Sequence, residues 1–225
     1  SGLSVMLDST DVTSSVMSVG EWEWEAVLTV TGDTTEGDVS ITVSYADYAG
    51  NTGTDVVSTS DSSKVIVDTT APTLLDVSIS SSNANSSVAM AGDVVTLYVR
   101  SDEGLAESLS GLSVMLDSTD VTSSVMSVGE WEWEAVLTVT GDTTEGDVSI
   151  TVSYADYAGN TGTDVVSTSD SSKVIVDTTA PTLLDVSISS SNANSSVAMA
   201  GDVVTLYVRS DEGLAESLSG LSVML

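Results

Sequence analysis

The sequence predicts an all-β fold made of tandem seven-stranded antiparallel β-sandwiches that stack head to tail. The segment 1–7 recurs at 110–116 and again at 219–225, so the unit that repeats is 109 residues long. This period is the size of one small sandwich domain and is too long for a solenoid unit. Within each repeat, short segments alternate apolar and polar residues, which indicates strands with one buried face. Clusters of Gly, Asn, Asp and Ser separate these segments and favour turns.

Seven strands are expected in one repeat, followed in chain order from the residue after Pro72. They cover residues 74–79, 94–100, 112–116, 121–128, 131–139, 148–154 and 165–176. A short helical turn is also expected over 103–109. Because each strand reverses direction, an odd number of strands places entry and exit at opposite ends of the domain. Successive repeats would therefore form a rod instead of folding back on each other.

The domain boundaries fall at Pro72 and Pro181, the two prolines of the chain. Proline lacks an N–H and fixes φ, so it suits a strand entry or a stiff linker and not a central strand. One complete repeat then spans 72–180. Residues 1–71 form a partial repeat without its first two strands, and residues 181–225 form a partial repeat with only the first strands. We expect the chain to be a section of a longer array.

Composition excludes several classes of function. Thirty-four acidic residues stand against four basic ones, which gives a net charge of −30. This balance argues against nucleic acid and anionic membranes as partners, and no apolar segment is long enough to insert into a membrane. The apolar fraction of 41% favours a folded core over disorder. The chain has no Cys and no His, so disulfides, thiolate nucleophiles and imidazole bases are absent.

Enzymatic activity is not expected. No Ser lies in a motif that supplies a base or an oxyanion partner, and the paired carboxylates lack the pocket motif of a glycosidase. Lys173 is interpreted as a surface lysine; an isopeptide crosslink to a nearby Asn or Asp is the alternative.

The tryptophans have two interpretations. Trp131 and Trp133 share the alternation of Ala135 and Leu137 and are expected in the core, with Glu130, Glu132 and Glu134 on the solvated face. The alternative is a carbohydrate-stacking platform, which exposure of one Trp beside Tyr157 would favour.

Two motifs carry a family resemblance that spans the whole period. The segment 67–73, Val-Asp-Thr-Thr-Ala-Pro-Thr, resembles the boundary motif of bacterial immunoglobulin-like (BIg) repeats in giant surface adhesins. The segment 154–163, Tyr-Ala-Asp-Tyr-Ala-Gly-Asn-Thr-Gly-Thr, is similar to their Asp-x-Ala-Gly-Asn loop, and 92–97 with 101–103 is similar to the segment that leads to Ser-Glu.

The resemblance implies an immunoglobulin-like (Ig-like) fold and an extracellular, cell-surface protein exported by a type I or related system. The array would act as a structural extender that holds a terminal ligand-binding region away from the cell, stiffened by calcium between domains. Its partners would be neighbouring identical repeats, in the same or adjacent chains, with a surface or matrix ligand bound by regions outside this segment. The alternative function is a self-assembling filament or sheath in which neighbouring chains complete each other's sandwiches.

Topology gathers carboxylates where two repeats meet, because the loops after the second and sixth strands lie at the entry end of the domain. Calcium takes six to eight hard oxygen ligands, and these loops offer them. At the first boundary the expected ligands are Asp68, Asp102, Glu103, Asp156 and Asn160, facing Asp33 and Glu36 of the preceding repeat. At the second they are Asp177, Asp211 and Glu212, facing Asp142 and Glu145. The alternative is that Asp and Asn only shape turns while Glu is a solvated charge.

Overall fold

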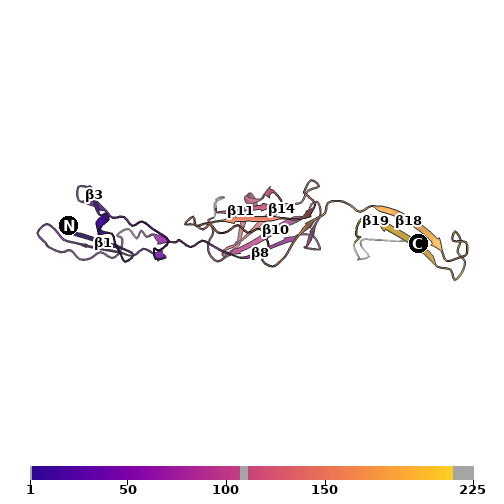
Figure 1. The fold of residues 1–225 in the computed structure, drawn as a ribbon, viewed down its shortest axis with the longest axis horizontal. Coiled ribbons are helices and arrows are strands. Elements are labelled where there is room, and N and C mark those ends of the chain that lie inside the picture. The colour runs from indigo at the N-terminus through magenta and orange to yellow at the C-terminus, as the bar shows by residue number, and fades with distance from the viewer. Residues whose placement is uncertain (1, 107–110, 215–225) are drawn as a thin grey trace.

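The computed structural model is all-β and extends along one axis, with the two chain ends far apart (Figure 1). It describes residues 2–106 and 111–214. Three bodies follow one another along the axis, and the middle one is the largest (Figure 1). Within the described residues, no helix is both long and apolar enough to span a bilayer.

The N-terminal body carries two small antiparallel sheets and a hairpin. Strand β1 pairs with β2 and β6, β3 pairs with β4, and β5 pairs with β7. Its elements are β1 (Leu3–Leu7), β2 (Thr10–Asp11), the 3₁₀ turn η1 (Thr13–Ser15), β3 (Met17–Gly20), β4 (Glu23–Glu25), β5 (Gly37–Asp38), β6 (Ile41–Tyr45) and β7 (Ile66–Val67).

The middle body contains three sheets, with strand orders β13-β14-β10-β8, β12-β11-β16 and β15-β17-β9. Its elements are β8 (Leu74–Ser81), β9 (Val88–Ala89), β10 (Val94–Ser101), β11 (Leu112–Leu116), β12 (Thr119–Asp120), the 3₁₀ turn η2 (Thr122–Ser124), β13 (Met126–Gly129), β14 (Glu132–Thr138), β15 (Gly146–Asp147), β16 (Ile150–Tyr154) and β17 (Ile175–Val176). All of these pairings are antiparallel except β17 with β9, which is parallel.

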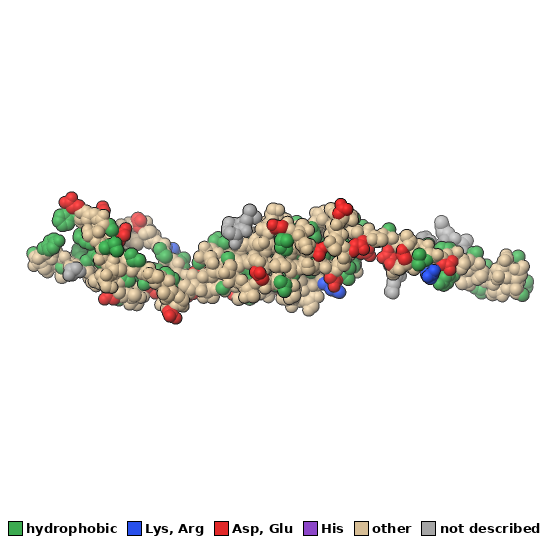
Figure 2. Space-filling model, turned by 45° about the horizontal axis from the view of Figure 1, so that its top comes forward, with side chains coloured by type: hydrophobic (Ala, Val, Ile, Leu, Met, Phe, Trp, Pro, Cys, Tyr) green, Lys and Arg blue, Asp and Glu red, His purple; other side chains and the backbone are tan. Residues whose placement is uncertain are grey.

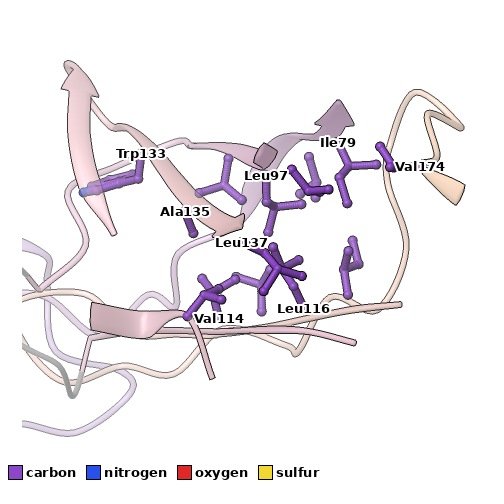
Figure 3. Packing of buried hydrophobic residues seen from close by; sticks show 14 of the residues in the cluster. Ile79, Leu97, Val114, Leu116, Trp133, Ala135, Leu137 and Val174 are labelled. Atoms are coloured by element: carbon purple, nitrogen blue, oxygen red, sulfur yellow. The ribbon is translucent and has the colours of Figure 1, made fainter. Parts of the chain in front are cut away.

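The hydrophobic core lies between the two larger sheets of the middle body. Strand β10 alternates half-exposed and buried residues along its whole length, as the period-two pattern predicts. Leu97 from β10 and Ile79 from β8 pack on one side, opposite Val114 and Leu116 from β11 (Figure 3). All members of the buried cluster lie between Val77 and Val176, inside the predicted complete repeat.

The C-terminal body is a two-stranded hairpin of β18 (Leu183–Ser190) and β19 (Val204–Ser210). Its sequence is identical to that of β8 and β10, but its apolar side chains face solvent. Val186 and Ile188 are 56% and 63% exposed, whereas the same residues in β8, Val77 and Ile79, are 2% and 5% exposed. The difference arises because no second sheet covers the hairpin among the described residues.

The same comparison explains the strand lengths of the N-terminal body. Strand β14 spans seven residues in the middle body because it pairs with β10 along its whole length. The identical sequence in the first copy forms only the three-residue β4, since β3 is the one strand paired with it in the described chain. Pairing with a neighbour, and not local propensity, therefore sets the length of this strand.

Three expected elements differ from the structure. The strand expected over 121–128 is divided into η2 and β13, because Ser124 and Val125 donate backbone hydrogen bonds to Val121 and Thr122 and close a 3₁₀ turn. The last strand is interrupted: it consists of a bridge at Val165 and the short β17. Residues 103–106 form no helical turn, and residues 107–109 lie outside the described chain.

Candidate metal site at the repeat boundary

The loop after β16 is shaped by one buried carboxylate. Asp156 is 2% exposed, and its Oδ1 accepts hydrogen bonds from the backbone N–H of Gly159 at 2.7 Å and of Asn160 at 2.9 Å. Its Oδ2 accepts from Nδ2 of Asn160 at 2.8 Å. A carboxylate that satisfies several donors of a tight loop fixes the loop, which explains the Asp-x-x-Gly-Asn pattern.

A second loop is held against the first and presents Glu103. Leu105, which is almost fully buried, forms a β-bridge with Asp156, and the N–H of Ala106 donates to the carbonyl of Ala155 at 3.0 Å. Burial of Leu105 anchors the segment after β10, so the position of Glu103 follows from core packing.

The linker supplies the third carboxylate. Nδ2 of Asn160 donates to the backbone carbonyl of Asp68 at 3.2 Å and to its Oδ1 at 3.3 Å, so the linker is attached to the middle body. Carboxylate oxygens of Asp68, Glu103 and Asp156 all lie within 4.8 Å of one another. The predicted residues Asp68, Glu103, Asp156 and Asn160 therefore come together, with the Asn amide bridging two of the acids.

The preceding repeat reaches the boundary through Glu36. Its Oε1 accepts from the N–H of Thr69 at 3.0 Å, the hydroxyl of Thr69 at 2.7 Å and the hydroxyl of Thr70 at 2.8 Å. The Thr-Thr pair that follows Asp68 thus connects the turn before β5 to the linker. Sequence analysis did not assign a role to these threonines, although their place in the boundary motif was the available signal.

Two of the expected ligands are placed elsewhere. Both carboxylate oxygens of Asp102 are engaged by Thr73, one by the backbone N–H at 2.8 Å and the other by the hydroxyl. These hydrogen bonds hold the pKa of Asp102 below its usual value and make it a clamp on the entry to β8. Asp33 is exposed in the turn 31–34, outside the three-acid cluster.

Electrostatic repulsion is concentrated on Glu103. Desolvation raises the pKa of Glu103 first, and the charges of Asp68, Asp156, Asp102 and Glu36 raise it further. Cations do not relieve this repulsion: the ion pairs in the described chain are Lys64–Asp38, Arg100–Asp76 and Lys173–Asp147. The last of these places Lys173 on the surface, as expected. Three adjacent carboxylates without a cationic side chain are suited to a divalent cation.

The second boundary repeats only part of this arrangement. Oε1 of Glu145 accepts from Thr178 and Thr179, and Asp211 is engaged by Thr182 in the same way as Asp102 by Thr73. The pKa of Glu212 is raised by desolvation and by Asp177, Asp211 and Glu145. Asp142 is exposed in its turn. Acidic side chains gather on the neck beside the C-terminal body (Figure 2).

The structure corrects the prediction for Trp131. Trp133 is buried at 8% exposure, but Trp131 is 45% exposed and lies in the turn before β14 with a φ of 61°. The left-handed backbone at this residue breaks the period-two alternation, so Trp131 leaves the face that Trp133 shares with Ala135. A Cβ added at Gly104 would lie 3.0 Å from the ring of Tyr157 and 3.8 Å from Nε1 of Trp131. Two largely exposed aromatic rings therefore flank one glycine.

Comparisons with known proteins give little guidance. No family model and no curated protein matches the sequence. Among solved structures, the SGBP-B protein of the Bacteroides ovatus mixed-linkage glucan utilization locus, in complex with a mixed-linkage heptasaccharide, is 18% identical with a TM-score of 0.23. The match covers 82% of this chain but 41% of that protein, and a TM-score this low carries no argument about fold or function.

Proposed function

We propose that the chain is a section of a structural extender of a cell-surface adhesin. Ig-like sandwich repeats, linked head to tail outside the cell, would form a rod that holds a ligand-binding region away from the surface. Calcium at each repeat boundary would stiffen the rod. The observation that carries the proposal is the cluster of Asp68, Glu103 and Asp156, which brings together a linker and two loops.

The donors of this cluster fit calcium. Calcium binds six to eight oxygen atoms from carboxylates, carbonyls and water, and it tolerates irregular geometry. Asp68, Glu103 and Asp156 offer three carboxylates, and Glu36 adds its charge from the preceding repeat. An ion bound by the linker and by both of its neighbours would restrict hinge motion at Asp68. Extracellular modules of this kind bind calcium with a Kd of roughly 0.1–1 mM, which suits calcium-rich surroundings.

Thermal unfolding tests the calcium site. For a Kd in that range, about 10 mM Ca²⁺ should stabilise the middle body by about 1.4–2.7 kcal/mol relative to EDTA. Small-angle scattering under the two conditions should give a longer and less flexible particle with Ca²⁺. An unfolding temperature and scattering profile that ignore EDTA would remove calcium from the proposal.

Glu103→Gln assigns the effect to this cluster. The pKa of Glu103 lies above its usual 4.5 in the folded state, so its ionisation costs stability as pH rises through that window. In EDTA at pH 7 the Gln variant should therefore be more stable than the parent chain, and this gain should vanish near pH 3.5, where both forms are neutral. The variant should also lose the response to Ca²⁺. Glu212→Gln is the matched control and should keep it, since the metal-ligand cluster of the described chain does not include Glu212.

A second candidate function is carbohydrate binding at the aromatic pair Trp131 and Tyr157. Exposed aromatic rings beside a glycine allow a sugar ring to approach and stack, and each copy of the repeat carries the same residues. This surface would make the rod itself adhesive.

Titration with β-glucan oligosaccharides while tryptophan fluorescence is monitored tests this function. Binding should quench the signal, and Trp131→Ala should weaken binding at least about tenfold, which corresponds to roughly 1.4 kcal/mol. Met126→Ala, at an equally exposed residue of the neighbouring β13, is the control and should leave binding unchanged. Equal responses from the two variants would argue against the aromatic pair.

A further inference from the structure

The two end bodies of the chain are complementary parts of the same repeat. In the middle body, β10 pairs along its whole length with β14, from Val94 opposite Thr138 to Arg100 opposite Glu132. The hairpin β18–β19 repeats the sequence of β8–β10, and residues 23–29 repeat that of β14. Each end body therefore holds the partner sequence that the other lacks.

The N-terminal body has an open edge and open apolar grooves where that partner would lie. Strand β4 pairs with β3 on one edge, whereas its counterpart β14 pairs on both. A groove of about 370 Å³ is lined by Leu3, Val5, Leu7, Trp24 and Ile41, and an adjoining groove of about 300 Å³ by Leu28, Val30 and Val65. The counterparts of Leu7, Ile41 and Val65 are Leu116, Ile150 and Val174, which pack against Ile79, Val95 and Leu97 in the middle body.

The hairpin carries the side chains that would fill these grooves. Val204 of β19 is 43% exposed, whereas its counterpart Val95 is fully buried. The outer edge of the hairpin is also open. In the middle body, Val77 and Ile79 of β8 donate backbone hydrogen bonds to the hydroxyls of Ser169 and Ser172, at 2.9 Å each. The N-terminal body has the same serines at positions 60 and 63.

A hairpin cannot reach the N-terminal body of its own chain, because the two lie at opposite ends of the long axis (Figure 1). We propose that the hairpin β18–β19 of one chain completes the N-terminal body of a second copy, with β19 paired antiparallel to residues 23–29. The register follows from the middle body: Thr205 lies opposite Val27, and Arg209 lies opposite Glu23. This head-to-tail contact joins different surfaces and does not close on itself, so chains add end to end into a linear filament.

The pairing would also complete the second boundary. Asp47 of the second copy corresponds to Asp156, so it would lie beside Asp177 and Glu212 as Asp156 lies beside Asp68 and Glu103. The pairing itself depends on strand hydrogen bonds and apolar burial and does not depend on calcium or on the proposed function. It opposes a net charge of −30 on each chain, so we expect it to strengthen with salt.

Disulfide trapping tests the register, and the absence of Cys from the chain gives a clean background. Four single variants are made: Val27→Cys, Glu23→Cys, Thr205→Cys and Arg209→Cys. Facing residues of antiparallel strands have Cα atoms about 4.5–5.5 Å apart, within disulfide range, whereas a shift of four residues adds roughly 13 Å. The matched mixtures 27 with 205 and 23 with 209 should therefore crosslink upon oxidation, and the crossed mixtures 27 with 209 and 23 with 205 should not.

The mixtures are oxidised in EDTA at about 0.5 M NaCl, so that the result is independent of calcium. We expect covalent dimer from matched mixtures in at least roughly tenfold excess over crossed ones, and a sedimenting mass of the parent chain that rises with concentration. Equal yields from matched and crossed mixtures would overturn the register. A parent chain that stays monomeric and gives no crosslinks in any mixture would overturn the pairing itself.

Discussion

Leu97→Ala is expected to destabilise the middle body by about 3–5 kcal/mol, measured by chemical denaturation. Leu97 is 1% exposed at the centre of β10, between β8 and β14, and its side chain points into the core shared with Val114 and Leu116 (Figure 3). Truncation removes three buried carbon atoms and leaves a cavity that the surrounding strands can close only in part, because both sheets are fixed by their hydrogen bonds.

Leu206→Ala is the matched control, since Leu206 has the same neighbours in sequence as Leu97 but lies in the exposed hairpin. Denaturation of the middle body of the monomeric chain should not change in this variant. The same substitution should reduce filament formation if the hairpin enters a second copy. A cost for Leu97→Ala as small as that for Leu206→Ala would contradict the packing of β10 described above.

The two leucines also show how far the sequence predicts the fold. Alternation located β8, β10, β11 and β14 to within a residue or two, because each of these strands buries one face in the middle body. Alternation is blind to whether a partner exists, so it predicts the same strand for residues 131–139 and for their copy at 22–30. The structure differs there because strand length depends on the neighbour.

Alternation also failed where the backbone turns. Trp131 has the spacing of a core residue, but a positive φ rotates it out of the strand, and no local pattern announces that change for a tryptophan. The division of 121–128 into η2 and β13 has a similar origin, since a single 3₁₀ turn shifts the phase of the pattern.

The candidate site was predicted by topology more than by motif. Loops at the same end of a sandwich meet, so Asp68, Glu103, Asp156 and Asn160 could be grouped before their contacts were known. Topology does not distinguish a carboxylate that faces a ligand from one that serves its own loop. Asp102 is next to Glu103 in sequence, yet Thr73 takes both of its oxygens, and only the hydrogen bonds reveal this difference.

Asp156→Ala should have the second large effect, with a loss of roughly 3–5 kcal/mol in the middle body and of the response to Ca²⁺. The carboxylate accepts three hydrogen bonds from Gly159 and Asn160 in a buried position, and hydrogen bonds to charged groups contribute about 1.5–3 kcal/mol each. Water would reach part of the loop and recover some of this loss. Asn160 would also lose the partner that orients its amide toward Asp68, so the linker attachment should loosen.

Two further variants separate the loop role from the charge role of Asp156. Asp47→Ala removes the same hydrogen bonds from an exposed copy of the loop, where water can replace them, and should cost about 1 kcal/mol or less. Asp156→Asn keeps an acceptor for the loop but removes one charge beside Glu103. Because Asp156 is one of the charges that raise the pKa of Glu103, this pKa should fall in the Asn variant, as measured by NMR titration in EDTA. An unchanged pKa, or a calcium response that survives in Asp156→Asn, would show that the three carboxylates do not act as one site.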